Sequence, residues 1–229
     1  ALQAALVDFT ELGDPRGEAR CHMGLALLAR AQGDLATVER RLAQAQDGYE
    51  RAGTRLGVAE SLNQLGDCAR LRGDSGRAVR LYREAMERFL ELEAPSVDMV
   101  RANLAQALID QGRHDDARVH LDACIDRFAH RGQRAMVGAL QVVLLLCDAH
   151  DADWDLFAEH LRQGRALLQV TGFHDLDVAR AARAAGHAVG AGRPDLAGAA
   201  LLLARSQFQA LDRADDVLAL DVELAQLRG

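Results

Sequence analysis

A turn that recurs every forty residues is the feature that most constrains the fold of this chain. Glycine marks the turn at Gly33, Gly73, Gly112 and Gly192, and Ala152 stands at the remaining position of the series. A fixed period of this length is the signature of a repeat architecture, in which each repeat is one supersecondary unit. The sequence therefore predicts a stack of similar units.

Apolar residues after each turn follow a helical spacing. They recur five, nine, twelve and sixteen residues past the turn, and offsets that differ by three or four residues share one face of a helix. The last of these positions is the most distinctive, because together with Phe9, one period earlier, it holds five of the nine aromatic residues of the chain. Extended one period back, it reads Phe9, Tyr49, Phe89, Phe128, Leu168 and Phe208.

Before each of the first three turns a large residue stands beside a small one, as in Leu65–Gly66 and Leu104–Ala105, and this favours two closely crossing helices. We therefore expect an all-α fold of stacked helix pairs, because one pair cannot bury its apolar face alone. The pairs are expected to form one continuous domain over residues 1–229. Its parts are a leading half-repeat at 1–12, five repeats at 17–53, 56–93, 96–132, 135–172 and 175–212, and a trailing helix at 213–229.

Composition and charge exclude several classes of protein. The net charge of −7 argues against nucleic acid as a partner, since phosphate binding needs a clustered positive surface. No apolar run is long enough to span a bilayer and no signal peptide is visible, so we expect a cytoplasmic protein without a membrane partner. The four cysteines have no disulfide-like spacing. The abrupt, apolar start predicts that the chain is a fragment of a longer protein.

No catalytic motif is present: HExxH, GxGxxG and the Walker phosphate loop are all missing, and no serine stands in a GxSxG turn. We therefore expect no enzyme activity, no cofactor and no metal site. Asp151, Asp153 and Asp155 alternate as in a calcium loop, but the glycine and the bidentate glutamate of such a loop are absent. A helix start, where acidic residues are favoured, is the preferred interpretation. Trp154 fits a binding hot spot or, preferably, packing against the turn.

These columns resemble the tetratricopeptide repeat family in its longer-period form, as found in bacterial multidomain regulatory proteins. The closest unit is AESLNQLGDCARLRGDSGRAVRLYREAMERF, and the resemblance covers essentially the whole chain. The matching residues of this unit are Leu65, Gly66, Ala69, Gly73, Ala78, Tyr82 and Ala85. The pattern weakens in the fourth repeat, where Ala152 replaces the turn glycine and Asp148 takes a position expected to be buried and small or apolar. The resemblance implies a right-handed α-solenoid.

The resemblance also implies that the first helix of each pair lines a concave groove that receives a peptide or helix from a partner. The positions implied here are Arg20, Met23, Leu27, Arg30, Glu60, Asn63, Gln64, Asp67, Arg70, Met99, Asn103, Gln106, Val142, Leu146 and Arg183. Asn and Gln can each donate and accept hydrogen bonds, so they can hold the backbone of an extended peptide. The alternative is a solvated face that merely follows the common residues of the family.

Two functions fit these features. The first is a module for protein–protein interaction or scaffolding that binds a peptide or helical segment, including one from another domain of the same parent protein, as the regulatory part of a larger bacterial protein. The second is a sensor whose solenoid changes curvature when a peptide or small molecule binds. A carboxylate-specific groove is not implied, because the chain has no lysine and only Arg20, Arg30, Arg70 and Arg183 could serve.

Overall fold

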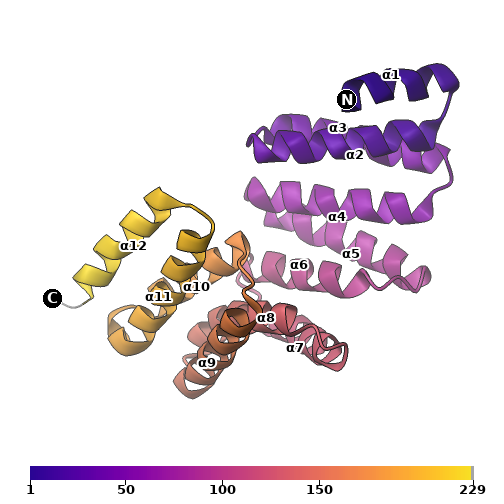
Figure 1. The fold of residues 1–229 in the computed structure, drawn as a ribbon. Helices are drawn as coiled ribbons and strands as arrows, with labels where there is room; N and C mark the ends of the chain where they lie inside the picture. Colours follow the sequence, from indigo (N-terminus) through magenta and orange to yellow (C-terminus); the bar gives the residue numbers. More distant parts are fainter. Residues whose placement is uncertain (228–229) are drawn as a thin grey trace. The chain divides into compact units, whose positions relative to one another are not determined.

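The computed structural model describes residues 1–227, except for the side chain of Ala191. This part of the chain contains α-helices and one short 3-10 helix but no strand, which confirms the all-α prediction (Figure 1). The chain divides into two compact units, unit 1 at Ala1–Gln111 and unit 2 at Gly112–Gly229. A single uninterrupted domain stays a prediction, and each unit is described by itself.

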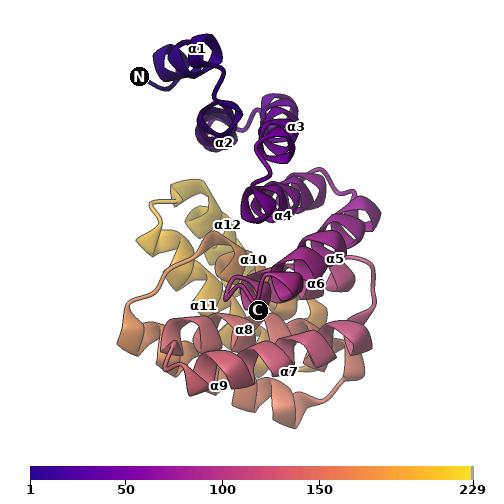
Figure 2. The same ribbon diagram turned by 90° about the vertical axis from the view of Figure 1, so that its right-hand side faces the viewer.

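Unit 1 is built from helix pairs joined by short turns (Figures 1 and 2). Helix α2 packs against α3 and α4 against α5, and each pair contacts the next because α3 lies against α4 and α5 against α6. Helix α1 packs against α2. The helices are α1 (Leu2–Leu12), α2 (Pro15–Ala31), α3 (Leu35–Arg51), α4 (Arg55–Leu71), α5 (Ser75–Glu91) and α6 (Val97–Ile109).

Unit 2 repeats the pairing but stacks its last pair differently. Helices α8 and α9 form one pair and α10 and α11 another, with α7 against α8 and α12 against α11. Helix α10 packs on α8. The elements are α7 (His114–His130), α8 (Arg134–Asp151), α9 (Trp154–Thr171), α10 (Leu176–Val189), the 3-10 turn η1 (Gly190–Gly192), α11 (Pro194–Ala210) and α12 (Ala214–Gln226). Residues 228–229 of the expected trailing helix lie outside the described residues.

The turns between helices place one residue in the left-handed region at a regular interval. Gly33, Gly73 and Gly112 have φ of 75°, 79° and 74°, as the period predicts, and Ala152 takes the same role with φ of 54°. The register of the fourth repeat is therefore kept despite its missing glycine. The fifth turn differs, because its positive φ falls on Gly190. Between pairs, Glu93 and Asp212 adopt φ of 50° and 55° at positions where the other repeats have glycine.

Ala152→Gly is expected to stabilise the chain by about 1 kcal/mol, because an L-residue with a Cβ loses roughly this much in the left-handed conformation. The melting temperature should rise by about 2–4 °C, measured by circular dichroism. Ala149→Gly, placed inside α8, is the control and should lower it, since glycine weakens a helix interior by about 1 kcal/mol. If Ala152→Gly and Ala149→Gly lower the melting temperature equally, the backbone of Ala152 is not strained.

The aromatic column lies in the core, as its spacing predicts, except that Phe9 is only half-buried. Tyr49, Phe89, Phe128 and Phe208 are all buried, and Leu168 occupies the same position in the fourth repeat. All four cysteines are buried free thiols that act as small apolar residues. Within the described residues, no helix has the length and hydropathy that a membrane crossing requires.

Candidate functional site

The predicted groove residues of unit 1 lie on the first helices of its pairs, α2, α4 and α6. Each of these twelve side chains is exposed or half-buried, so all can meet a partner. On α2 they are Arg20, Met23, Leu27 and Arg30; on α4, Glu60, Asn63, Gln64, Asp67 and Arg70; on α6, Met99, Asn103 and Gln106. The period of the sequence thus places polar groups at equivalent positions along neighbouring first helices.

Five of these residues form a hydrogen-bonded surface that we call the polar face. Arg30 Nη1 donates to Gln64 Oε1 at 3.3 Å and pairs with Asp67 Oδ2 at 3.5 Å. Asn103 Nδ2 donates to Asn63 Oδ1 at 3.1 Å and to Asp67 Oδ1 at 3.4 Å. Two of the amides expected to hold a peptide, Asn63 and Asn103, are therefore already joined to each other, and Gln64 is joined to Arg30.

Tyr82 of α5 connects the polar face to the core. Its side chain is completely buried, and its hydroxyl donates to Asp67 Oδ1 at 2.6 Å. Burial raises the pKa of Tyr82, and the charge of Asp67 raises this pKa further. The phenol therefore stays protonated and acts as a donor at neutral pH. Asp67 is thus oriented from three sides, by Arg30, Tyr82 and Asn103.

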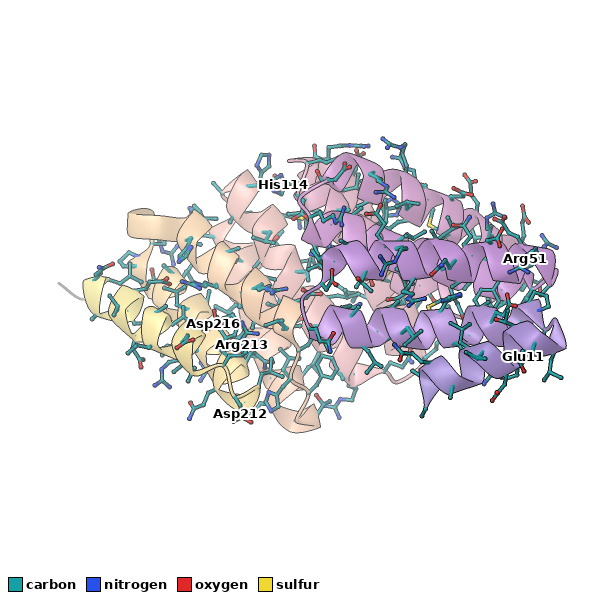
Figure 3. The ribbon with its side chains drawn as sticks, turned by 90° about the horizontal axis from the view of Figure 1, so that it is seen from above. Glu11, Arg51, His114, Asp212, Arg213 and Asp216 are labelled. Carbon is teal, nitrogen blue, oxygen red and sulfur yellow. The ribbon has the colours of Figure 1, made fainter. Side chains whose placement is uncertain are left out.

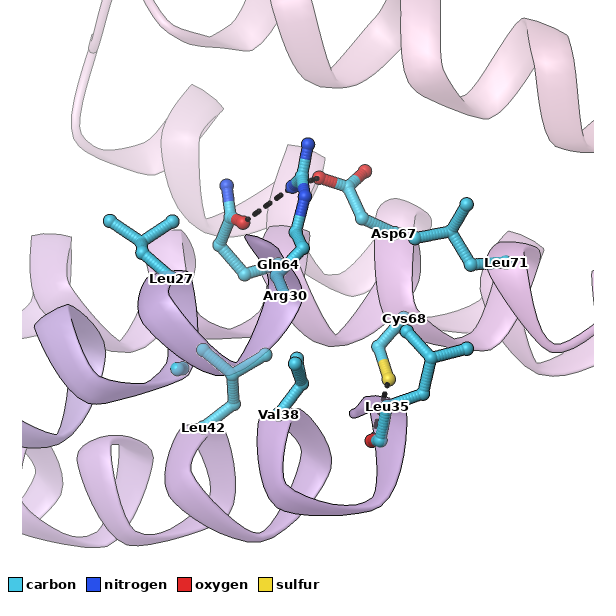
Figure 4. Close-up of a pocket in the computed structure, with 10 residues that line it drawn as sticks. Leu27, Arg30, Leu35, Val38, Leu42, Gln64, Asp67, Cys68 and Leu71 are labelled. Carbon is cyan, nitrogen blue, oxygen red and sulfur yellow. Dashed lines mark hydrogen bonds and ion pairs between the residues drawn. The ribbon is translucent and has the colours of Figure 1, made fainter. Parts of the chain in front are cut away.

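A small cavity lies beneath the polar face, between α2, α3 and α4 (Figure 4). Leu27, Leu42 and Leu71 are among its lining residues, and Arg30, Gln64 and Asp67 stand at its edge. Cys68 Sγ lies 3.6 Å from the Leu35 carbonyl beside it. The cavity volume is about 10 Å³, which is enough for at most one water molecule. A ligand of unit 1 would therefore bind on the face itself and not inside this cavity.

In unit 2 the three predicted groove residues lie in different surroundings. Val142 is fully buried against Gly164 of α9, so its predicted place on a binding surface is wrong. The reason is that α7, α9 and α10 all pack on α8 and cover nearly every face of it. Leu146 is half-buried on the same helix.

Arg183 of α10 is engaged with α12. It forms an ion pair with Glu223, and its Nη1 lies 3.9 Å from Asp216 Oδ1. Burial alone would raise the pKa of Glu223, but hydrogen bonds from Arg183 and His187 outweigh it and hold this pKa below its ordinary value. Arg183 therefore has a structural partner on the neighbouring helix.

The acidic segment that resembles a calcium loop is the start of α9, as the preferred interpretation predicts. Asp153 is the N-cap residue, and its Oδ1 accepts from the Leu156 backbone amide at 3.0 Å. Trp154 is half-buried and meets Phe157 edge to face with ring centroids 6.4 Å apart. Among residues 1–227, no three His, Cys, Asp or Glu side chains are grouped so that they could hold a metal ion.

One cluster in unit 2 was not predicted as a cluster. Asp148 is completely buried; its Oδ1 accepts from Arg118 Nη1 at 2.9 Å, and its Oδ2 lies 2.7 Å from His160 Nδ1. These residues come from α8, α7 and α9. The repeat pattern of the sequence indicated that position 148 is buried. It could not indicate the partners of Asp148, because Arg118 and His160 lie on two other helices and form no local motif with Asp148.

Comparison with known proteins agrees with this architecture. The tetratricopeptide repeat family model matches residues 18–91, which span α2 to α5. No curated protein sequence matches the chain.

Solved structures match far more of the chain, at low sequence identity. The apo form of RapI superposes with a TM-score of 0.75 at 11% identity and covers 99% of this chain and 89% of its own. A Rap protein complexed with competence and sporulation factor has a TM-score of 0.64 at 11% identity, with 93% and 75% covered. The nearly identical TPR-like repeats attributed to a kinesin light chain of Podosopora anserina reach 0.58 at 16% identity, with 91% and 94% covered. The predicted resemblance is confirmed: the chain has the fold of tetratricopeptide-like repeat proteins and carries the sequence signature of that family over residues 18–91.

Proposed function

We propose that the chain is a protein-interaction module that binds a peptide or helical segment on the first-helix face of unit 1. The observation that carries this proposal is the polar face, where Arg30, Asn63 and Asn103 are held around Asp67. A preoriented set of donors and acceptors loses little side-chain entropy on binding, so more of the contact energy appears as affinity.

The chemistry of the polar face favours an extended or helical polypeptide. Gln64, Asn63 and Asn103 offer both donors and acceptors to a backbone. Leu27 and Met99, which are 52% and 41% exposed, lie on α2 and α6 and can meet apolar side chains of a partner. We place this module in the cytoplasm, as the regulatory part of a larger bacterial protein, with another domain of that protein among its candidate partners.

The similarity to a Rap protein complexed with competence and sporulation factor supports a peptide-sensing role as the second candidate. In such a role a ligand of unit 1 would bind on the polar face, because the cavity beside Arg30 holds no more than one water molecule. A short peptide at a hundredfold excess over its Kd should then raise the stability by about 2.7 kcal/mol. A scaffold would show no such response to short peptides but would retain a protein partner.

The test is the double variant Asn63→Ala/Asn103→Ala. Each lost amide removes about 1 kcal/mol of binding, so we expect retention of a partner from lysate to weaken about tenfold or more. The fold should survive, because the two amides bond to each other and Asp67 keeps Tyr82 and Arg30. Quantitative mass spectrometry of the retained proteins measures the effect.

The matched control is Gln3→Ala/Gln44→Ala, which removes two exposed amides of unit 1 from α1 and α3. It should retain the same proteins as the unmodified chain. If the Asn63→Ala/Asn103→Ala variant also retains them at unchanged levels, the polar face is not the binding surface.

A further inference from the structure

The last helix pair of unit 2 is stacked in a way that leaves one side of α9 uncovered. In unit 1 each new first helix lies on the preceding second helix, α4 on α3 and α6 on α5. Helix α10 instead lies on α8, and α9 only touches α11. The face of α9 that would receive the next helix in a regular array is therefore open.

The connection between α9 and α10 explains this change of direction. Asp175, the N-cap residue of α10, has an extended backbone with φ of −148° and ψ of 142°, whereas Thr54 before α4 has φ of −86° and ψ of 81°. The buried Gln207 of α11 holds the connection, because its Oε1 accepts from Asp175 N at 3.1 Å and its Nε2 donates to the Phe173 carbonyl at 3.4 Å. The new direction of α10 is thus built into the fold.

The uncovered side of α9 forms a cavity of about 350 Å³ with α11, which we call the α9–α11 groove. Its apolar lining residues are Ala158, Leu161, Ala166, Leu196 and Ala199. Two arginines, Arg162 and Arg165, stand among them. Arg162 is paired with Glu159, but Arg165 is exposed and makes no hydrogen bond or ion pair with any described residue. The groove therefore offers an apolar floor beside an uncompensated positive charge.

Helix α12 carries the complementary surface. Leu218 and Val222 are 67% and 53% exposed, and Asp215 lies on the same side because the spacings of three and seven residues share one helical face. Its neighbour Asp216 already forms an ion pair with Arg213, the N-cap residue of α12, at 3.0 Å (Figure 3). Asp215 is exposed and has no such partner among residues 1–227. We call Asp215, Leu218 and Val222 the α12 stripe.

We propose that the α9–α11 groove of one molecule binds the α12 stripe of a second copy of this chain. Leu218 and Val222 would pack against the apolar residues of the groove, as the apolar face of an amphipathic helix does in a hydrophobic groove. Asp215 would form an ion pair with Arg165. The apolar residues supply the affinity and the opposite charges set the orientation. This contact is independent of the polar face of unit 1, so it adds self-association to the proposed binding of a partner.

Light scattering after size exclusion tests the proposal over a range of protein concentrations. We expect the mass to rise above the 24.8 kDa of one chain as the concentration increases. Arg165→Glu and Asp215→Arg should each weaken the association about tenfold or more, because each places like charges opposite each other. The double variant Arg165→Glu/Asp215→Arg should associate again, since the pair is restored with its signs exchanged.

Arg80→Glu is the control, because it makes the same charge change at an exposed arginine of α5 in unit 1. It should associate like the unmodified chain. A chain whose mass stays at 24.8 kDa at every concentration overturns the proposal. This holds even if Arg165→Glu abolishes the retention of a foreign protein, because the groove would then bind that protein and not a second copy. Association that persists in Arg165→Glu and in Leu218→Ala also overturns it, because the contact would then lie elsewhere.

Discussion

Replacing Asp148 by alanine is expected to destabilise the chain by about 3–5 kcal/mol, the usual loss when one partner of a buried ion pair is removed. Natural domains are stable by only about 5–15 kcal/mol, so this single change should shift the unfolding midpoint strongly or leave the protein partly unfolded. Chemical denaturation followed by circular dichroism would measure the change.

The size of this effect follows from the position of the carboxylate. Asp148 is completely buried, and both of its oxygens have partners on other helices, Arg118 on α7 and His160 on α9. Without the carboxylate, the half-buried Arg118 keeps only the outer pair with Asp151 at 2.8 Å. A cationic group would then face a cavity where its counter-charge had been, and desolvation without compensation is the costly part of such a substitution.

Asp151→Ala is the matched control, because Asp151 binds the same guanidinium group from a more exposed position, with 36% of its side chain accessible. An exposed ion pair contributes about 0–1 kcal/mol, so the midpoint should barely move. The unfolding midpoint of Asp148→Asn should lie between those of Asp148→Ala and Asp151→Ala, since asparagine keeps the shape of the side chain and can still accept a hydrogen bond from Arg118. Equal stability of Asp148→Ala and Asp151→Ala would contradict the structural role assigned to the buried cluster.

The sequence predicted the parts of the fold that depend on local periodicity. The turn column and the aromatic column follow from spacing within one chain segment, so Gly73 and Phe89 were assigned correctly. The substitution of Ala152 for glycine did not move the turn, because the flanking helices α8 and α9 are paired through close contact at Gly138 and Gly164. Packing between helices determines the backbone conformation here more strongly than the preference of one residue.

The remaining features depend on which helices meet, and periodicity does not contain this information. Val142 was assigned to a surface because the family resemblance implies that the residue ten positions before the turn lines the groove. The chain changes direction at Asp175, the N-cap residue of α10, and α10 then packs on α8. Helix α8 therefore has one more neighbouring helix than the period implies. The polar face shows the same limit. Its residues were identified by position, but the pairing of Asp67 with Tyr82 joins a first helix to a second helix and became visible only in three dimensions.

Tyr82→Ala is expected to destabilise the chain by about 3–5 kcal/mol, the usual loss for a large buried aromatic residue. Its ring is completely buried and fills the space above Gly66, where a Cβ would lie only 2.6 Å from Cε1 of the ring. The substitution therefore removes both the packing between α4 and α5 and the hydroxyl that orients Asp67. Tyr82→Phe keeps the ring and removes only the hydroxyl, so it should lose about 1–2 kcal/mol.

Gly66→Ala supplies the coupled test of this packing. In the unmodified chain the new methyl group would collide with the Tyr82 ring, and overpacking of this kind costs about 1–3 kcal/mol. In a Tyr82→Leu background the ring is gone, so the same glycine substitution should be nearly neutral. The interaction energy from this double-mutant cycle, measured by urea denaturation, should therefore exceed about 1 kcal/mol. Additive effects would mean that the small residue at position 66 is required by something other than the tyrosine. A strong coupling, together with a modest loss in Tyr82→Phe, would show that one side chain both sets the crossing of α4 and α5 and holds the central carboxylate of the polar face.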